Sequence, residues 1–519
     1  MKAVATALAL AALAAMALPA RAQDSATVDE LLARNRIASG MERRSESERE
    51  SWTFRAGGLS GTLETLRRGS DILSTTMLGP FHSEHGIERG QRWHQNDNGE
   101  TVLDRADPSQ SERVVAQAVA RVREPLDGWE LTTTYGSGHV LRDYYDARTY
   151  LLVRKEKTIA GQTVRTNYDD FRADARGRLR AWHYFGSDER AGTEFDYHLV
   201  RDDSAPAVAE SELAVPRERR TLVEFPPGVE SVRLPARIEN GRIFVRLTVG
   251  GRGLDFLLDS GASALLIDEG IARTLALPAY GKGTRTVAGS FATSRVIAPL
   301  VEVGPLAMRD VVMRTIPLAA HDTPGTRVVG LLGFDFLDAA GIKIDYANGT
   351  VDALRPGELA APPGAVALDV RLSAQTPAAR ATFGDAAGED FVLDTGTDLA
   401  VVVFQRFARA HPDIVTSLPE ERVRLGSGVG GSLPYRPIVA RRLELGSLVF
   451  DDAAAYEAIS PDALGFDNKD GIIGGDVLRR FTVYLDYAAG RVYLAPAAHV
   501  TRASATPRPA APLSFRSRR

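Results

Sequence analysis

The stretch FLLDSGAS, residues 256–263, decides the fold, because it places Asp259 directly after three large apolar residues. A carboxylate beside a buried strand is costly unless it is hydrogen-bonded, paired or held neutral. The same arrangement returns 135 residues later as FVLDTGTD, residues 391–398, with Asp394 in the matching position. Two such carboxylates in matched contexts require a joint explanation.

A longer internal repeat follows each of these stretches. The segment GLLGFDFLDAAGIKIDYANGTVDAL, residues 330–354, aligns without a gap on GIIGGDVLRRFTVYLDYAAGRVYLA, residues 471–495, and nine of the 25 positions are identical. Each block is predicted to contain, in order, a strand, D-[ST]-G, a helix-like segment, a glycine-rich hairpin, a second strand, apolar-apolar-Gly, a short helix and a D-Y-x-x-G hairpin. The pattern predicts two copies of one supersecondary plan.

Composition bounds the class of protein. The chain has 519 residues, of which 44% are hydrophobic and 25% charged, which is typical of a globular protein of about three domains. A net charge of −4 gives no indication of nucleic-acid binding. The absence of cysteine excludes disulfides, a cysteine nucleophile, a cysteine-ligated metal and lipid attachment through an N-terminal cysteine.

Residues 1–22 have the features of a signal peptide: Lys2, an apolar run, and Ala20-Arg21-Ala22 as a cleavage site. We expect export, cleavage before Gln23, and a periplasmic or secreted protein with no stable membrane anchor. Retention of the segment as an uncleaved anchor is the alternative. The last residues, 497–519, are basic and proline-containing, which predicts a disordered tail.

The remaining sequence divides into four parts. Residues 23–203 begin with a helix at 27–40, capped by Thr27 and Glu30, and continue with alternating apolar and polar residues that predict an antiparallel sheet. Residues 204–220 are a proline-containing linker, and residues 221–356 and 357–496 are the two repeated blocks.

The blocks resemble the aspartic proteases, in particular the retropepsin-like branch. The resemblance covers about 275 residues and rests on linked motifs: D-S-G at 259–261, D-T-G at 394–396, GLLG at 330–333 and GIIG at 471–474. It implies a mainly β fold, a bilobal pair of β-barrels with both half-sites on one chain, preceded here by an antiparallel half-barrel-like sheet domain with an N-terminal helix. It also implies that Asp259 and Asp394 are catalytic.

Paired carboxyl groups suit peptide hydrolysis without a cofactor or a metal. One carboxylate deprotonates water while one carboxylic acid polarises the carbonyl, and two carboxyls in contact share a single proton because both cannot ionise at close range. Gly261 and Gly396 allow each loop to turn sharply. In this family the hydroxyl residues at the positions of Ser260 and Thr395 cross-link the two loops.

Two glycine-containing stretches are candidate flaps over an extended substrate. They lie at 286–296 and 424–435 and contain Gly289, Gly428, Gly430 and Gly431. Glycine suits the mobile tip of a hairpin that closes by main-chain hydrogen bonding. Ordinary surface hairpins are the alternative, and no tyrosine is present at the first tip, unlike the flap of pepsin-like enzymes.

The blocks depart from the family pattern at two places. Ala262 follows the first motif, whereas Thr397 follows the second and could donate a hydroxyl to its carboxylate. The mixed pair predicts activity from acid toward near-neutral pH. Asp398 adds a third acid, which either disturbs the titration of the pair or faces solvent.

Residues 23–203 resemble, more loosely, the lipoprotein-carrier type of periplasmic half-barrel. His82, His85 and His94 raise the question of a metal, but residues three apart on a strand point to opposite faces. We therefore expect no metal site.

Three hypotheses of function remain open. The first is an exported aspartic endopeptidase that acts on extended peptides or proteins and needs only a monomer, because its lobes pair within one chain. The second is a peptide-binding module of protease fold that does not cut. The third is a carrier of hydrophobic molecules through the N-terminal domain.

Overall fold

The structure of this protein is a computed structural model. The predicted signal peptide, residues 1–22, and the tail beyond residue 497 lie outside the residues that it describes. Within the described part, no helix is both long and apolar enough to cross a membrane. The described residues are 26–103, 113–124, 126–136, 138–159, 161–203, 207–216, 221–318, 327–373, 375–413, 416–417, 423–429, 431–439, 442–451, 453–459 and 469–497.

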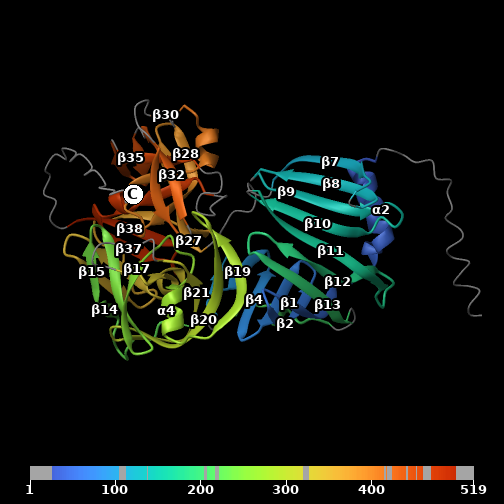
Figure 1. Cartoon of the computed structure of the whole chain (residues 1–519), viewed down its shortest axis with the longest axis horizontal. Helices are drawn as coiled ribbons and strands as arrows, with labels where there is room; N and C mark the ends of the chain where they lie inside the picture. The colour runs from blue at the N-terminus through green and yellow to red at the C-terminus, as the bar shows by residue number, and fades with distance from the viewer. Residues whose placement is uncertain are drawn as a thin grey trace, which may run out of the picture. The chain divides into compact units, whose positions relative to one another are not determined.

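The fold is mainly β, which confirms the predicted class, and the chain forms two compact units (Figure 1). The first unit comprises residues up to 56, 60–69 and 107–209, and the second comprises 57–59, 70–106 and 210 onward. The second unit thus contains both repeated blocks together with a piece of the N-terminal region. The domain limits expected from the sequence stay a prediction.

The predicted N-terminal helix is α2, Val28–Ser39. Its capping box is present, because the Thr27 hydroxyl accepts from the Glu30 N–H at 3.2 Å and the Glu30 carboxylate accepts from the Thr27 N–H at 2.9 Å. Gly40 ends the helix in the left-handed conformation with φ of 66°. Leu31 packs in a small core with Trp129 and neighbouring side chains of the sheet.

The sheet strands of the first unit follow the order β2-β1-β13-β12-β11-β10-β9-β8-β7. Successive strands in the chain are mostly neighbours, so the sheet is a meander of hairpins, and each pairing described in register is antiparallel. The strand bounds are β1 Ser47–Ala56, β2 Leu59–Arg68, β7 Val114–Val122, β8 Gly128–Tyr135, β9 Val140–Asp146, β10 Leu152–Ile159, β11 Gln162–Ala173, β12 Leu179–Asp188 and β13 Thr193–Asp203.

One face of this sheet carries stacked aromatic rings. Tyr197 stacks on Phe54 with ring centroids 4.4 Å apart and on Tyr184 at 4.5 Å, and Trp52 meets Tyr184 edge-on at 5.0 Å. Such aromatic pairs across strands stabilise a sheet beyond the area that they bury.

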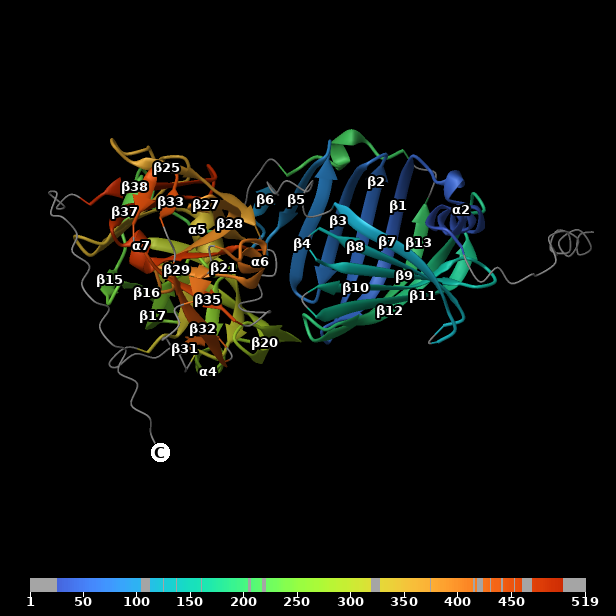
Figure 2. The ribbon, with the colours of Figure 1, turned by 90° about the horizontal axis from the view of Figure 1, so that it is seen from above.

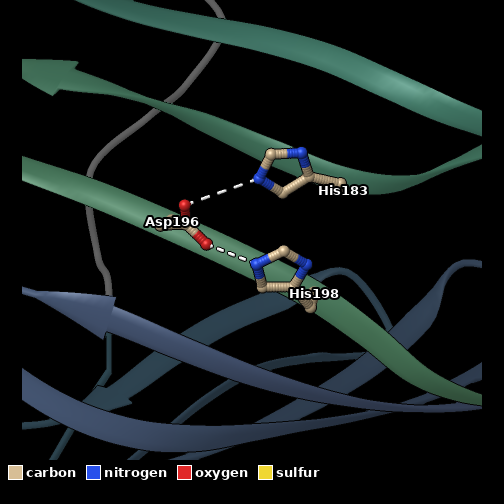
Figure 3. A group of neighbouring side chains, drawn as sticks. All are labelled: His183, Asp196 and His198. Carbon is tan, nitrogen blue, oxygen red and sulfur yellow. Dashed lines mark ion pairs between the residues drawn. The ribbon is translucent and has the colours of Figure 1, made fainter.

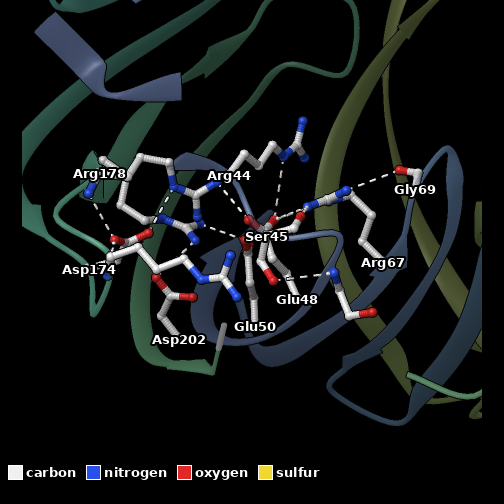
Figure 4. A network of polar contacts seen from close by, with 12 residues as sticks. Arg44, Ser45, Glu48, Glu50, Arg67, Gly69, Asp174, Arg178 and Asp202 are labelled. Carbon is white, nitrogen blue, oxygen red and sulfur yellow. Dashed lines mark hydrogen bonds and ion pairs between the residues drawn. The ribbon is translucent and has the colours of Figure 1, made fainter. Parts of the chain in front are cut away.

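A network of buried charges holds the start of β1 to β2 and to the turn before β12 (Figure 4). The Glu48 carboxylate, whose side chain is 3% exposed, lies 2.9 Å from Arg67 Nη2 and 2.7 Å from Arg178 Nη1. Arg178 also binds Asp174 at 2.9 Å, and Arg67 donates to the Gly69 carbonyl at 3.0 Å. Each buried charge therefore has an opposite partner, as burial requires.

In the second unit, four strands of the N-terminal region follow the order β6-β5-β4-β3. The turn between β5 and β6 docks on the first block, where the Asn98 side chain accepts from the Val312 N–H at 2.8 Å and donates to its carbonyl at 3.1 Å. Asp97 beside it binds Arg314 at 2.5 Å and Arg295 at 3.4 Å. The bounds are β3 Asp71–Leu78, β4 Phe81–Glu88, β5 Gln91–Gln95 and β6 Thr101–Leu103.

The first block, or lobe 1, forms a sheet in the order β15-β16-β17-β22-β18-β21-β20-β19, and β20 also pairs with β16, which closes it into a barrel. Its helices are α4, Glu269–Thr274, and α5, Phe334–Ala339. The strand bounds are β15 Ala236–Glu239, β16 Arg242–Val249, β17 Arg252–Leu258, β18 Leu266–Asp268, β19 Ala279–Thr286, β20 Ser290–Val303, β21 Leu306–Ile316 and β22 Gly330–Leu332.

The second block, or lobe 2, has the sheet order β30-β32-β35-β29-β36-β28-β27-β33-β34, with β26 beside β27 and β31 beside β32. Figure 2 labels β27, β28, β29, β32 and β35 of this sheet. Its helices are α6, Gln405–Ala410, and α7, Gly475–Leu478. The strand bounds are β26 Arg371–Ser373, β27 Thr376–Phe383, β28 Ala386–Asp394, β29 Val401–Val403, β30 Thr416–Ser417, β31 Arg424–Gly428, β32 Gly431–Val439, β33 Leu443–Leu445, β34 Leu448–Phe450, β35 Ala454–Ala458 and β36 Gly471–Gly474.

A third sheet joins the lobes through their D-Y-x-x-G hairpins. Its order is β14-β24-β23-β37-β38-β25, and the central pair β23 and β37 comes from different lobes, with Ile342 opposite Leu485. Lobe 1 supplies one half of the sheet, lobe 2 the other, and both contribute to one continuous core. The bounds are β14 Ser231–Arg233, β23 Gly341–Asp345, β24 Thr350–Leu354, β25 Val366–Asp369, β37 Phe481–Asp486 and β38 Arg491–Pro496.

Candidate active site

Asp259 and Asp394 occupy matching places in the two lobes. Asp259 follows β17, which runs parallel to β22 with Leu258 opposite Leu332, and its N–H donates to the Leu332 carbonyl at 3.2 Å. Asp394 ends β28, which runs parallel to β36 with Leu393 opposite Ile473. In each strand the three residues before the aspartate, 256–258 and 391–393, are apolar and buried, so each aspartate marks the point at which the chain leaves the core.

Ser260 and Thr395 cross-link the two loops below these aspartates. The Ser260 N–H donates to Thr395 Oγ1 at 3.0 Å, and the Thr395 N–H donates to Ser260 Oγ at 2.9 Å. Each hydroxyl also donates across the boundary, Ser260 to the Leu393 carbonyl at 2.7 Å and Thr395 to the Leu258 carbonyl at 3.0 Å. Both side chains are almost fully buried, so these four bonds fix one loop against the other.

The glycines of the two motifs face the opposite aspartate. A β-carbon on Gly261 would lie 2.7 Å from Asp394 Cγ, and one on Gly396 would lie 2.4 Å from Asp259 Cγ. Each glycine also donates its N–H to the aspartate of its own motif, at 2.8 Å and 2.7 Å respectively. Glycine is thus required for close approach between lobes.

The two carboxyl groups lie on facing loops, each against the motif glycine of the other lobe, and each influences the pKa of the other. Burial, and then the charge of Asp394, raises the pKa of Asp259 well above its ordinary range. Burial also raises the pKa of Asp394, although hydrogen bonds from Gly396 and from Asp259 oppose the shift. Both aspartates are partly exposed, so solvent can reach them. A pair of this kind holds one proton between two oxygens.

The GLLG and GIIG segments pass behind the two loops. A β-carbon on Gly333 would lie 2.4 Å from the Ala264 carbonyl oxygen, and one on Gly474 would lie 2.2 Å from that of Leu399. Gly330 and Gly471 are equally crowded by the rings of Phe256 and Phe391. The glycines let each segment lie flat against its loop, which holds the aspartate in place.

The structure shows the surroundings of Ala262, Thr397 and Asp398, the residues that depart from the family pattern. Asp398 is exposed, so it faces solvent. The Ala262 N–H donates to the main-chain carbonyl of Asp259 at 3.2 Å, and the backbone N–H groups of Ala262 and Thr397 each lower the pKa of the aspartate in their own lobe. The Thr397 hydroxyl accepts weakly from the Leu399 N–H at 3.4 Å.

Both predicted flap stretches contain β-hairpins, β19–β20 and β31–β32, and the tips of these hairpins meet. The Ala288 N–H, next to Gly289, donates to the Val429 carbonyl at 3.0 Å. Ala288 packs against an apolar cluster of lobe 2, and Val429 packs against one of lobe 1. Gly428 and Gly431 flank the second tip, whereas Gly430 lies outside the described residues.

Three tyrosines near the pair were not predicted: Tyr435 and Tyr487 are buried, and Tyr346 is partly buried. The Tyr487 hydroxyl reaches the Ser260 carbonyl at 3.5 Å, and burial, then the charge of Asp259, raises its pKa. Tyr346, in the matching hairpin of lobe 1, has its pKa raised by burial and then by Asp394. Burial and the charge of Asp394 raise the pKa of Tyr435, on β32, to about 12. The repeat places Tyr487 and Tyr346 in matching D-Y-x-x-G hairpins but does not indicate that they lie near the aspartates.

One protein-family model matches part of the chain. Residues 245–336 match the family model described as aspartyl protease, a stretch that includes Asp259 and GLLG but not Asp394. This match confirms the resemblance predicted for lobe 1 and supports a protease-type function at the level of the family. No curated protein matches the chain.

The solved structures that are similar to this chain include an aspartic proteinase and a DUF1329 family protein. An aspartic proteinase from Irpex lacteus has 13% sequence identity and a TM-score of 0.34, covering 52% of this chain and 98% of its own. A DUF1329 family protein from Desulfovibrio piger has 11% identity and a TM-score of 0.26, covering 36% of this chain and 97% of its own.

Proposed function

We propose that this chain is an exported aspartic endopeptidase in which Asp259 and Asp394 together activate water. The observation that carries the proposal is that each carboxyl group lies against the motif glycine of the other lobe, across a loop junction fixed by Ser260 and Thr395. A pair with one shared proton supplies both the base and the acid that amide hydrolysis requires.

In the proposed reaction, the ionised carboxyl takes a proton from water while the protonated carboxyl donates a hydrogen bond to the scissile carbonyl. The hydroxide oxygen bonds to the carbonyl carbon and forms a tetrahedral intermediate. Its collapse breaks the C–N bond, the leaving nitrogen receives a proton from the pair, and the pair returns to the singly protonated state. The proton belongs to the pair and is assigned to neither residue.

We further propose an extended peptide as the substrate, held between the pair and the hairpin tips. The two tips meet through the bond from the Ala288 N–H to the Val429 carbonyl, and hairpins of this kind can recognise an extended chain by main-chain hydrogen bonds. The shared six-stranded sheet joins the lobes within one chain, so a monomer suffices. Export to the periplasm or beyond follows from the predicted signal peptide, and a mature N-terminus at Gln23, read by mass spectrometry, tests it.

The decisive experiment is cleavage of a peptide library by the wild type and by Asp259→Asn and Asp394→Asn, followed by mass spectrometry with and without a statine-type inhibitor. Each substitution should abolish cleavage, and the inhibitor should do the same to the wild type. Asp398→Asn is the matched control, because this exposed acid follows the same loop and should leave the rate unchanged. Undiminished cleavage by either dyad variant contradicts the proposal, and peptide binding without cleavage at any pH favours a non-cutting module.

A further inference from the structure

Three metal-ligating side chains meet on neighbouring strands of the first unit, far in sequence from the aspartate pair. His183 comes from β12, and Asp196 and His198 come from β13 (Figure 3). One ligand atom from each lies within 4.8 Å of the others. The Asp196 carboxylate lies beside the two rings and contacts both, 2.7 Å from His198 Nε2 and 3.5 Å from His183 Nε2.

Strand register brings these residues together. His183 pairs with His198 across β12 and β13, and Asp169 pairs with His183 across β11 and β12. Asp196 lies two residues before His198, so its side chain projects from the same face. Tyr184 follows His183 in the sequence and Tyr197 precedes His198, so both tyrosines project from the other face of the sheet, which carries the stacked aromatic rings.

The two nitrogens of His183 have different surroundings. Nδ1 lies 2.6 Å from Asp169 Oδ1, an arrangement in which the ring donates Nδ1–H and leaves the lone pair on Nε2. Nε2 is buried, has no hydrogen-bond partner, and faces an Asp196 oxygen. Two acceptor atoms that face each other in this way are both satisfied by a cation. A carboxylate on the far nitrogen is also the usual partner of a metal-bound histidine.

The local charge favours a cation as well. Asp169, Asp170 and Asp196 gather around the two rings, and Arg172 is already bound to Asp170 at 2.6 Å. Arg55, on β1, is paired in register with Asp196. The rings of His183 and His198 stack with centroids 4.4 Å apart and planes 7° apart, so a positive charge on both rings would be repulsive.

We propose that His183, Asp196 and His198 bind a divalent transition-metal ion of the zinc class, with Asp169 as a positioning residue. Two imidazoles and one carboxylate are ligands that Zn²⁺ prefers, whereas Ca²⁺ and Mg²⁺ prefer oxygen ligands alone. Asp196 and His198 are half-exposed, so the ion can enter from solvent and small side-chain rotations can bring the ligands to bonding distance. Three protein ligands leave a fourth position open to water or to another ligand.

Calorimetric titration of the metal-free full-length chain with ZnCl₂ tests the proposal, together with the visible absorption of the Co²⁺ form. One Zn²⁺ should bind per chain, and Ca²⁺ or Mg²⁺ should not compete. His183→Gln and His198→Gln should each weaken binding by more than about tenfold and remove the Co²⁺ bands, and Asp169→Asn should weaken it by about ten- to a hundredfold. His82→Gln, a strand histidine outside the cluster, should bind like the wild type.

Circular dichroism of each variant verifies that the sheet is folded. A double variant, His183→Gln with His198→Gln, that retains wild-type stoichiometry and affinity overturns the proposal, as does a wild-type chain that binds no Zn²⁺. Because peptide cleavage is measured separately, failure of this site leaves the aspartate pair untouched.

Discussion

Gly396 lies so close to Asp259 that a β-carbon on residue 396 would be 2.4 Å from the Asp259 Cγ atom. The reciprocal approach of Gly261 to Asp394 follows the same geometry. The loop of each lobe thus forms one wall around the aspartate of the other. The proposed site therefore needs both lobes, which would account for the two D-[ST]-G motifs in one chain.

Gly396→Ala should therefore abolish cleavage by displacing Asp259. A displacement of about 1 Å costs on the order of a hundredfold in rate, so kcat/KM should fall by at least that factor. Gly270→Ala on α4 is the control, because its β-carbon would meet only the Asp268 carboxylate at 3.1 Å. If the Gly396 variant retains wild-type kcat/KM, the close approach does not govern the reaction.

Thr395→Val should destabilise the junction between the lobes. The valine keeps the shape of threonine but leaves the buried Ser260 N–H without its acceptor and the Leu258 carbonyl without its donor. We expect a loss of about 1–3 kcal/mol in the free energy of unfolding, measured by denaturant titration.

Thr397→Val is the matched control for this substitution. It lies two residues further on the same loop, and its hydroxyl accepts only a weak bond, so the expected change is within about 0.5 kcal/mol. Equal losses in the two variants would contradict the role assigned to the cross-link.

The aspartate pair could be predicted from sequence because its signals are local and occur twice. Each aspartate follows three apolar residues and precedes a glycine, and the GLLG and GIIG segments recur at similar spacing. Ser260 and Thr395 were predicted from the family resemblance, and the structure shows the hydrogen bonds that join them. Predicting these features requires only the short-range sequence pattern and the premise that two half-sites combine.

The remaining contacts depend on pairings that no local pattern records. His183 and His198 meet only because β12 and β13 pair in one register, and their spacing matches no recognised ligand motif. The Asn98 side chain forms hydrogen bonds with the backbone N–H and carbonyl of Val312, as a neighbouring strand would, although the two residues are more than two hundred positions apart. Tyr487 lies beneath Ser260 because hairpins of both lobes share a sheet. In each case the tertiary fold, not the sequence neighbourhood, creates the contact.

The pH dependence of cleavage should extend above the range of an ordinary carboxyl group. Because burial and the charge of Asp394 raise the pKa of Asp259, the singly protonated pair persists above the usual aspartate pKa of about 3.9. A plot of kcat/KM against pH should be bell-shaped, with activity retained at about pH 5. A profile confined below about pH 3 would contradict the raised pKa.

The same shift has a consequence for stability. A carboxyl with a raised pKa in the folded state binds its proton more tightly there than in the unfolded chain, so the free energy of unfolding falls as pH rises through that interval. Asp259→Asn removes this titration and should flatten the dependence.

Gly431→Ala should separate the hairpin tips. Its β-carbon would lie 2.8 Å from the Ala288 carbonyl oxygen, so the bond between Ala288 and Val429 would be strained. Loss of about 1 kcal/mol shifts the ratio of closed to open tips about fivefold, and we expect KM to rise by that order while kcat changes less. Steady-state kinetics on one library peptide measures both, with Gly270→Ala again as the control. An unchanged KM would show that the tips do not hold the substrate.

Glu48→Gln should destabilise the sheet of the first unit more than any exposed substitution. Burial alone would raise the pKa of Glu48, but the hydrogen bond from Arg67 and the charge of Arg178 hold it below its ordinary range. The ionised group therefore contributes stability above the unfolded pKa of about 4.3, and that contribution is lost as pH falls through the lower folded pKa. Removing one charge from a buried pair costs about 3–5 kcal/mol, because the guanidinium groups of Arg67 and Arg178 remain buried without their counter-ion.

Thermal unfolding of this variant at pH 7 and again at low pH measures both effects. The wild type should approach the variant as pH falls, since protonation of Glu48 removes the same charge that the glutamine lacks. Glu46→Gln is the control: this residue is exposed two positions earlier in the chain, so its substitution should change little. A Glu48 variant as stable as the Glu46 variant at neutral pH would mean that the ion network contributes no net stability, because the cost of removing its charges from water cancels their attraction.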